Sequence, residues 1–229
     1  MLPSIVVIIP AFDEERSIAS VIADIPKHLI SEIIVVDNNS KDQTENVARA
    51  AGATVLFEKE QGYGAACLKG MAYLLSQKIQ PDIVVFMDGD YSDYGEQLPH
   101  VIQPILDNRF DMVIGSRALG KRERGSMTFP QIFGNWLATR LMKWIYKTTY
   151  TDLGPFRAIR YEALMQLGMK DRNYGWTVEM QLKAARQKLR ITEVSVDYRV
   201  RIGISKVSGT IKGTVMAGYK ILSTIFKYI

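Results

Sequence analysis

Two aspartates separated by one glycine follow a short apolar run near the middle of the chain. Residues 84–87 are apolar, and Asp88, Gly89 and Asp90 come directly after them. The run predicts a buried strand, and ligands of an open α/β sheet bind just beyond the carboxyl ends of its strands. Two carboxylates there can hold a hard divalent cation that keeps water and phosphate oxygens in its other positions. An acidic turn or a helix cap is the alternative interpretation.

Strand-like and helix-like segments alternate on both sides of this pair. We expect strands at residues 5–9, 33–36, 54–57, 83–87 and 112–114,. We expect helices between them at residues 14–25, 42–51, 62–77 and 96–106,. This alternation predicts an α/β fold with a doubly wound, mostly parallel sheet that helices cover on both faces.

The rhythm changes after Arg117. A charged, glycine-bearing loop at residues 120–126 precedes expected helices at 129–147 and 179–188,. An alternating segment at 191–198 predicts a strand, and residues 211–229 predict a C-terminal amphipathic helix,.

The composition bounds the class of protein. A chain of 229 residues with 47% hydrophobic content can bury the core of one domain,. Cys67 is the single cysteine, which excludes an intramolecular disulfide and fits a reducing, cytoplasmic location,. We see no signal peptide and no apolar run long enough to span a bilayer. We therefore expect a soluble or peripheral protein.

The net charge of +5 conceals two oppositely charged halves. Residues 1–116 carry 8 Lys and Arg against 17 Asp and Glu, whereas residues 117–229 carry 21 against 7. This asymmetry suggests a metal site in one half and anionic ligands in the other, such as a nucleoside diphosphate, an anionic lipid or nucleic acid. The basic half lacks the aromatic–basic modules of nucleic-acid readers, so we expect no nucleic-acid partner.

Polar residues also follow the first three expected strands. Pro10, Ala11 and Glu14 follow the first strand, and Asp37 follows the second. Carboxylates there can accept hydrogen bonds from a base or a ribose, although a helix cap or an Asx turn explains them equally well. Residues 61–64 follow the third strand, where two glycines permit close backbone approach and the helix amino end favours an anion,.

Together these segments resemble a known family. Residues 8–15, 35–44, 62–66 and 87–90 resemble, in this order, the signature of family 2 glycosyltransferases with the GT-A fold. Within that family the chain is most similar to the polyprenyl-phosphate sugar transferases, such as the dolichyl-phosphate mannose synthases. Residues 115–117, 152–157 and 201–206 resemble three later segments of those enzymes.

The resemblance implies one glycosyltransferase domain over residues 1–229. Residues 1–116 would form the nucleotide-sugar and metal half, residues 117–206 the acceptor half, and residues 207–229 the C-terminal amphipathic helix. Asp88 and Asp90 would bind Mg²⁺ or Mn²⁺ on the diphosphate of the donor, with Asp90 also counted as catalytic. The residues that would bind the nucleotide sugar besides Asp88 are Pro10, Ala11, Glu14, Asp37, Gln61, Gly62, Arg201 and Lys206.

The implied reaction is transfer of a sugar, with inversion, from a UDP- or GDP-sugar to a polyprenyl phosphate. Asp13, Asn38 and Gln61 depart from the usual family residues, so the base stays open. A phosphate acceptor is already ionised and needs orientation and charge screening, for which Arg117 is the candidate. A hydroxyl acceptor would require a base, and Glu179 would then serve.

Other functions stay open on the same donor site. They are transfer to a soluble hydroxyl acceptor, rearrangement of a sugar nucleotide, and nucleotidyl transfer. A non-enzymatic nucleotide-sugar sensor or nucleic-acid binder is disfavoured by the intact pair Asp88 and Asp90.

The two long helices expected in the basic half could contact a membrane surface. Residues 129–147 and 211–229 place aromatic side chains beside lysines and arginines, a composition that fits a helix lying in the lipid headgroup layer on the cytoplasmic face. Packing on the sheet, or on a second subunit in a homodimer, is the alternative.

Overall fold

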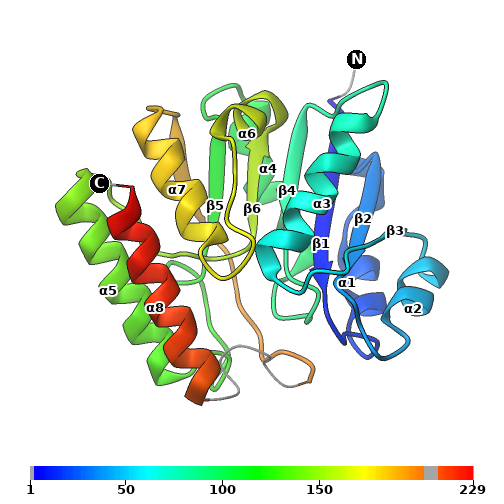
Figure 1. Cartoon of the computed structure of the whole chain (residues 1–229). Coiled ribbons are helices and arrows are strands. Elements are labelled where there is room, and N and C mark those ends of the chain that lie inside the picture. Colours follow the sequence, from blue (N-terminus) through cyan, green and yellow to red (C-terminus); the bar gives the residue numbers. More distant parts are fainter. Residues whose placement is uncertain (1–2, 204–210, 229) are drawn as a thin grey trace.

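The computed structural model of the protein describes residues 3–203 and 211–228. Its described strands form one seven-stranded sheet in the order β3-β2-β1-β4-β6-β5-β7 (Figure 1). The strands are β1 (Ile5–Ala11), β2 (Glu32–Asp37), β3 (Thr54–Phe57), β4 (Ile83–Phe86), β5 (Met112–Ser116), β6 (Arg157–Arg160) and β7 (Ile191–Ser195). All five strands predicted before residue 117 are present.

One strand reverses the direction of this sheet. β1 runs parallel to β2 and β4, β2 is parallel to β3, and β7 is parallel to β5. β6 is inserted antiparallel between β4 and β5. The prediction of a mostly parallel sheet is confirmed. β6 was not predicted, because its four residues begin and end with arginine and give no apolar run,.

Helices cover both faces of the sheet, as predicted. One face carries α1 (Ile18–Asp24), α2 (Thr44–Ala50) and α4 (Leu98–Leu106). The other carries α3 (Tyr63–Ser76), α5 (Phe129–Tyr146), α6 (Tyr161–Leu167), α7 (Trp176–Arg186) and α8 (Ile211–Lys227). Val6 and Ile8 of β1 point to the second core, and Val7 and Ile9 point to the first. This two-residue period fills both cores from a single strand.

Several boundaries differ from the expectation. The helix predicted from residue 14 begins only at Ile18, because the acidic residues before it form a loop tied to the chain after β2. The Asp13 amide donates to the Ser40 hydroxyl at 3.0 Å, and the Glu14 amide donates to Thr44 Oγ1 at 2.8 Å. β7 ends at Ser195 instead of residue 198, and α6 was not predicted.

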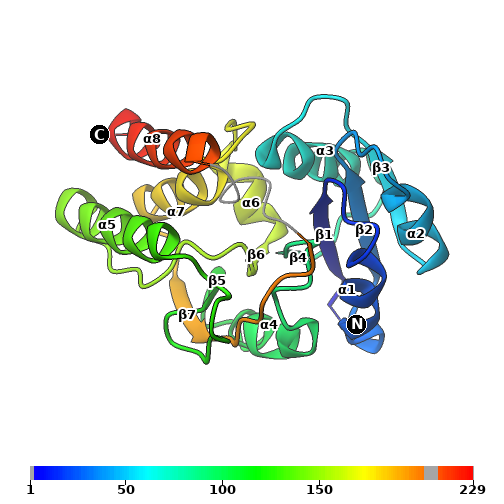
Figure 2. The same ribbon diagram turned by 90° about the horizontal axis from the view of Figure 1, so that it is seen from below.

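Helices α5, α7 and α8 lie side by side at one end of the molecule (Figures 1 and 2). The Tyr146 hydroxyl of α5 donates to the Ile225 carbonyl of α8 at 2.5 Å, and the Tyr228 hydroxyl donates to Glu179 Oε1 of α7 at 2.5 Å. Each of the two long predicted helices therefore packs on its neighbours along one side. Within residues 3–203 and 211–228, no helix is long and apolar enough to cross a bilayer.

The glycines before and inside α3 admit another part of the chain. A Cβ on Gly62 would lie 2.1 Å from the Arg172 carbonyl oxygen, and one on Gly64 would lie 2.0 Å from that of Asp171. The Ala65 amide donates to the Arg172 carbonyl at 2.9 Å. The close approach expected at these glycines is thus made by the loop before α7, which caps the start of α3.

We expect Gly64→Ala to destabilise the protein by about 1–3 kcal/mol, because the new methyl group must displace backbone atoms. Gly134→Ala is the matched control, since nothing lies within 4 Å of its Cβ position in α5. That variant should gain up to about 1 kcal/mol from helix propensity. Urea unfolding followed by circular dichroism measures both changes. Equal stability of the two variants would contradict the close packing of this loop on α3.

Candidate active site

A cleft of about 720 Å³ opens where β1 and β4 end and continues between α5 and α8. Nine of the predicted site residues line it, namely Pro10, Ala11, Glu14, Gln61, Gly62, Asp88, Asp90, Arg117 and Arg201. The described lining does not include Asp37 or Glu179. Lys206 lies outside the described residues. The structure therefore brings together most of the residues that the sequence singled out, from segments spread over the whole chain.

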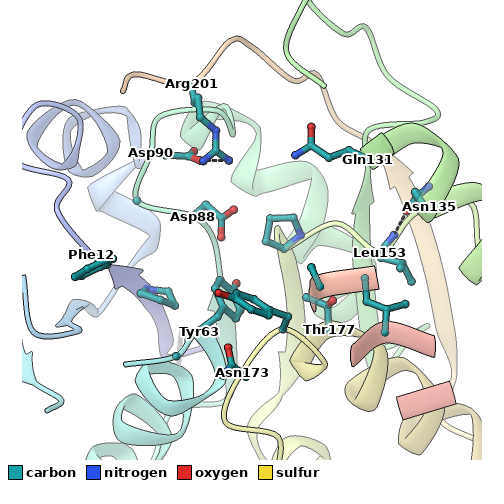
Figure 3. Close-up of a pocket in the computed structure, with 18 of the residues that line it drawn as sticks. Phe12, Tyr63, Asp88, Asp90, Gln131, Asn135, Leu153, Asn173, Thr177 and Arg201 are labelled. Atoms are coloured by element: carbon teal, nitrogen blue, oxygen red, sulfur yellow. Dashed lines mark hydrogen bonds and ion pairs between the residues drawn. The ribbon is translucent and has the colours of Figure 1, made fainter. Parts of the chain in front are cut away.

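Asp88 and Asp90 lie at the tip of β4, on the side of the cleft opposite α5 (Figure 3). Asp90 is buried, and its Oδ1 accepts hydrogen bonds from the Ser92 amide at 3.0 Å and the Ser92 hydroxyl at 2.5 Å. Its Oδ2 forms an ion pair with Arg201 Nη2 at 2.6 Å. Asp88 is half-buried and has its carboxylate directed into the cleft.

Carboxylates are crowded at this tip. Burial and the charge of Asp90 raise the pKa of Asp88 to about 7, although Arg201 and Arg117 act in the opposite direction. Burial and the charges of Asp88 and Asp90 raise the pKa of Asp93 to about 8. The excess negative charge means that a divalent cation would be favoured here.

The donor set fits a cation that is shared with a ligand. Among the described residues, no group of three or more His, Cys, Asp or Glu side chains is arranged to hold a metal ion. Mg²⁺ and similar ions are commonly held by one or two carboxylates, with phosphate and water oxygens in the remaining positions. Asp88 and Asp90 match that arrangement once Arg201 has left Asp90.

Asn38 fixes the end of the cleft between β2 and the start of α3. Its Nδ2 donates to the Glu60 carbonyl at 2.7 Å, and its Oδ1 accepts from the Gly62 amide at 2.7 Å. Asn38 was noted in the sequence only as a departure from the family pattern, yet it lines the cleft. Its neighbour Asp37 is buried, and Oδ1 of Asp37 has no hydrogen-bond partner among the described residues. Because this oxygen is buried outside the described lining of the cleft, the expected contact of Asp37 with a nucleoside stays a prediction.

Arg117 is held by Asp152. Nε and Nη2 of Arg117 each donate to the Asp152 carboxylate at 2.7 Å, and the Arg117 amide donates to it at 2.8 Å. The guanidinium also lies 5.0 Å from the centre of the Tyr198 ring. Burial alone would lower the pKa of Arg117, but Asp152 raises it well above its usual value. Arg117 is therefore a fixed, fully charged cation at the wall of the cleft.

The segment Asp152 to Arg157 is a structural support. Arg157 is fully buried, and its guanidinium donates to the Gly154 and Leu153 carbonyls and to the Thr177 carbonyl. Burial lowers its pKa to about 10. This arginine fixes the loop of Asp152 to the start of α7, so it acts on the site through the position of Asp152 and Arg117.

Glu179, the residue expected to act as a base if the acceptor is a hydroxyl, is not part of the described lining of the cleft. It is buried and accepts hydrogen bonds from the Asp171 amide at 2.6 Å and the Tyr228 hydroxyl at 2.5 Å. It also pairs with Lys183 at 2.7 Å. Burial acts to raise the pKa of Glu179, but the bonds from Lys183 and Tyr228 outweigh it and the pKa is lowered. Glu179 joins α7 to α8 and to the loop that caps α3.

Comparison with known proteins identifies the family of this chain. The model of the family described as glycosyl transferase family 2 matches residues 6–168. The chain belongs to glycosyl transferase family 2. The predicted family and glycosyltransferase activity are thus confirmed. An uncharacterized glycosyltransferase of Mycobacterium tuberculosis is 35% identical over 222 residues, covering 93% of this chain and 94% of that protein.

Two further proteins bear on the acceptor and the fold. A dolichyl-phosphate hexose transferase of Haloferax volcanii is 32% identical over 208 residues, covering 88% of this chain and 85% of its own. A crystal structure of glucosyl-3-phosphoglycerate synthase from Mycobacterium tuberculosis, in complex with Mn²⁺, UDP-glucose and phosphoglyceric acid, is 23% identical. It superposes with a TM-score of 0.78, covering 99% of this chain and 79% of that chain, and supports the predicted GT-A fold.

Several lining residues were not found from the sequence. Tyr63, Gln131, Asn135, Asn173 and Thr177 line the cleft. Asn135 of α5 fixes the loop after residue 150, since its Oδ1 accepts from the Leu153 amide at 2.9 Å and its Nδ2 donates to the Thr151 carbonyl at 3.0 Å (Figure 3). The amide side chains of Gln131 and Asn135, four residues apart in the otherwise largely apolar first half of α5, are the signal that could have indicated them.

We expect Glu179→Gln to destabilise the protein by about 2 kcal/mol or more, because it removes a buried charge that Lys183 and several donors balance. The kcat of the folded variant should stay within about twofold of the parent, since catalysis by a base contributes at least about 10²-fold. Glu162→Gln on the exposed side of α6 is the control and should change stability by less than about 0.5 kcal/mol,. A large loss of kcat in Glu179→Gln, with an unchanged free energy of unfolding, would instead support a role for Glu179 in catalysis.

Proposed function

We propose that this glycosyltransferase moves a sugar from a nucleoside diphosphate to a polyprenyl phosphate, with inversion at the sugar carbon. One observation carries the proposal. All carboxylates among the described lining residues, Glu14, Asp88 and Asp90, come from the donor half of the chain. The described lining from residues 117–206 and from α8 contains no Asp, Glu or His.

This distribution matters because acceptors differ in their need for a base. A sugar or glycerate hydroxyl must lose its proton as it attacks, and a carboxylate or histidine must lie beside it. A phosphate monoester is already negatively charged, so the acceptor side has only to orient it and screen its charge. An acceptor wall whose described residues include no carboxylate or histidine is therefore suited to a phosphate acceptor.

The donor end supports a metal-dependent reaction. Asp88 and Asp90 would hold Mg²⁺ or Mn²⁺, and a bound ion would stabilise the charge that develops on the departing diphosphate. The Mn²⁺ and UDP-glucose in the related synthase structure support the same arrangement. The orphan oxygen of Asp37 would accept a bond from the nucleoside, with Pro10, Ala11, Glu14, Gln61 and Gly62 around the nucleotide sugar. UDP and GDP both remain candidate carriers.

Cations would complete the site. Arg117 is our candidate for the acceptor phosphate, and Arg201 and Lys206 are those for the donor diphosphate. Arg117 and Arg201 both line the cleft, and their charges act to lower the pKa of Asp88, which supports the roles of these two arginines. Residues 1–116 would then serve the donor, residues 117–206 the acceptor apart from Arg201 and Lys206, and residues 207–229 the lipid.

The helices α5 and α8 offer a route for the lipid. Both line the cleft, through residues such as Pro130 and Gly134 of α5 and Gly218 and Ile221 of α8. The same helices expose large apolar side chains, among them Phe129 at 79%, Trp144 at 80% and Tyr219 at 68%. Aromatic side chains flanked by cations favour the headgroup layer of a membrane. A polyprenyl chain could thus remain at a membrane while its phosphate enters the cleft.

The printed activity of the Haloferax relative, a dolichyl-phosphate hexose transferase, supports a lipid phosphate acceptor. The related synthase structure contains phosphoglyceric acid, so a soluble acceptor is the competing candidate. Labelled UDP- and GDP-sugars should be offered with Mn²⁺ and either detergent-solubilised polyprenyl phosphate or phosphoglyceric acid. Label in the organic phase is the expected result. Turnover of the donor with soluble acceptor alone would overturn the proposal.

We expect Asp88→Asn to lower kcat by about 10³-fold, because one ligand of the ion that stabilises the leaving group is lost. The midpoint of thermal unfolding without metal should not fall, since the variant also relieves repulsion among the carboxylates. Asp107→Asn removes a carboxylate from the end of α4 and serves as the control for a change of charge alone. Full turnover by Asp88→Asn, or turnover in excess EDTA, would contradict the metal role.

We expect the double variant Phe129→Ser and Trp136→Ser to bind vesicles at least about tenfold more weakly, because each aromatic side chain contributes about 1.5–3 kcal/mol when buried. Co-sedimentation with vesicles that contain phosphatidylglycerol measures the affinity. Ile79→Ser is the matched control, since Ile79 is 85% exposed near the end of α3 and belongs to neither helix. An equal loss of vesicle affinity in Ile79→Ser would contradict a membrane contact through α5.

A further inference from the structure

Arg201 contacts the carboxylate that is proposed to hold the cation. Arg201 Nη2 lies 2.6 Å from Asp90 Oδ2, and Ser92 donates twice to Oδ1 of the same carboxylate. Both oxygens of Asp90 are therefore engaged by the protein itself. The Asp90 side chain is 6% exposed and that of Arg201 is 25% exposed, so the Arg201 guanidinium is the more accessible member of the ion pair.

The backbone of Arg201 is fixed on either side. The Ile202 amide donates to the Asp90 carbonyl at 2.9 Å, and the Arg199 amide donates to the Ser92 carbonyl at 3.0 Å. The Arg199 guanidinium lies 3.4 Å from the centre of the Tyr91 ring and pairs with Asp24 at 2.6 Å. The backbone is thus held against the loop after β4 on both sides of Arg201, and the Arg201 side chain can change its partner without moving it.

Resting on the proposed function, we propose that Arg201 occupies the place of the cation on Asp90 until the donor arrives, and then exchanges Asp90 for the donor diphosphate. At the tip of β4 the carboxylate of Asp88 is directed into the cleft, and that of Asp90 is neutralised by Arg201 (Figure 3). A divalent ion must displace Arg201 to gain its second carboxylate. A diphosphate favours this displacement, because it offers the guanidinium two phosphate groups that match its donor geometry.

The exchange couples the two ligands thermodynamically. A nucleoside diphosphate draws Arg201 away from Asp90 and thereby tightens binding of the cation, and the cation must tighten binding of the diphosphate by the same factor. Direct contact between cation and phosphate adds to this factor but does not depend on Arg201. A substitution of Arg201 therefore removes only the share of the coupling factor that comes from the exchange.

Titration of the protein with Mn²⁺, with free Mn²⁺ followed by electron paramagnetic resonance, tests the exchange without turnover. It should be run without nucleotide, with UDP and with GDP. For the unaltered protein we expect weak binding of Mn²⁺ alone and a gain of about 5–150-fold with the matching nucleotide. In Arg201→Met we expect Mn²⁺ alone to bind about tenfold more tightly, and the gain on adding nucleotide to shrink by a similar factor.

Two variants separate this exchange from other effects. Arg201→Lys keeps a cation beside Asp90 and should retain weak binding of Mn²⁺ without nucleotide. Arg190→Met removes an arginine that pairs with Asp111 at 2.6 Å, at the amino end of β5, and should change nothing. Thermal unfolding checks that each variant is folded.

The outcomes distinguish the two levels of the proposal. If Arg201→Met raises Mn²⁺ affinity equally with and without nucleotide, the effect is one of charge alone and the exchange is wrong. Unchanged binding of Mn²⁺ in Arg201→Met also overturns it. If the unaltered protein binds no Mn²⁺ with either UDP or GDP, it is the metal-dependent function itself that fails.

Discussion

The repulsion among carboxylates at the end of β4 governs the arrangement of the site. Asp88, Asp90 and Asp93 lie within six residues, and burial together with their mutual charge raises the pKa of both Asp88 and Asp93. Such a cluster is costly unless positive charge lies beside it. The positive charge beside this cluster is supplied by Arg117 and Arg201, which come from the basic half of the chain. The acidic and basic halves of the sequence thus face each other across one cleft.

The antiparallel strand β6 explains how the two halves meet. It lies between β4, which carries the carboxylates, and β5, which leads to Arg117. Its first residue, Arg157, holds the preceding loop through carbonyl groups, and that loop provides Asp152 for Arg117. A buried arginine with carbonyl partners has a strict geometry, because five donors in a plane must find acceptors. The position of Arg117 therefore depends on a strand that the sequence analysis did not predict.

The sequence indicates the ends of strands far better than the partners of side chains. Apolar runs closed by Pro10, Asp37 and Asp88 have the length and content of buried strands, so the donor half of the sheet was predictable,. The role of Glu179 was not, because only Lys183 follows it at the i,i+4 spacing of a helical ion pair, while the Tyr228 hydroxyl and the Asp171 amide reach it from two other segments that no local pattern links to it. Glycines near α3 suggested close approach correctly, but could not tell a ligand from the loop before α7.

Helix α5 links the chemistry of the cleft to the surface of the protein. Its first half contributes Gln131 and Asn135 to the cleft, while Phe133 and Trp136 of the same turns form a ridge with ring centres 5.7 Å apart, both about half exposed. A soluble sugar acceptor would need neither a described wall without carboxylates or histidines on one side of α5 nor an aromatic ridge on the other. They are complementary for a phosphate carried on an apolar chain, because the charged head and the chain then each meet the side of α5 that suits them.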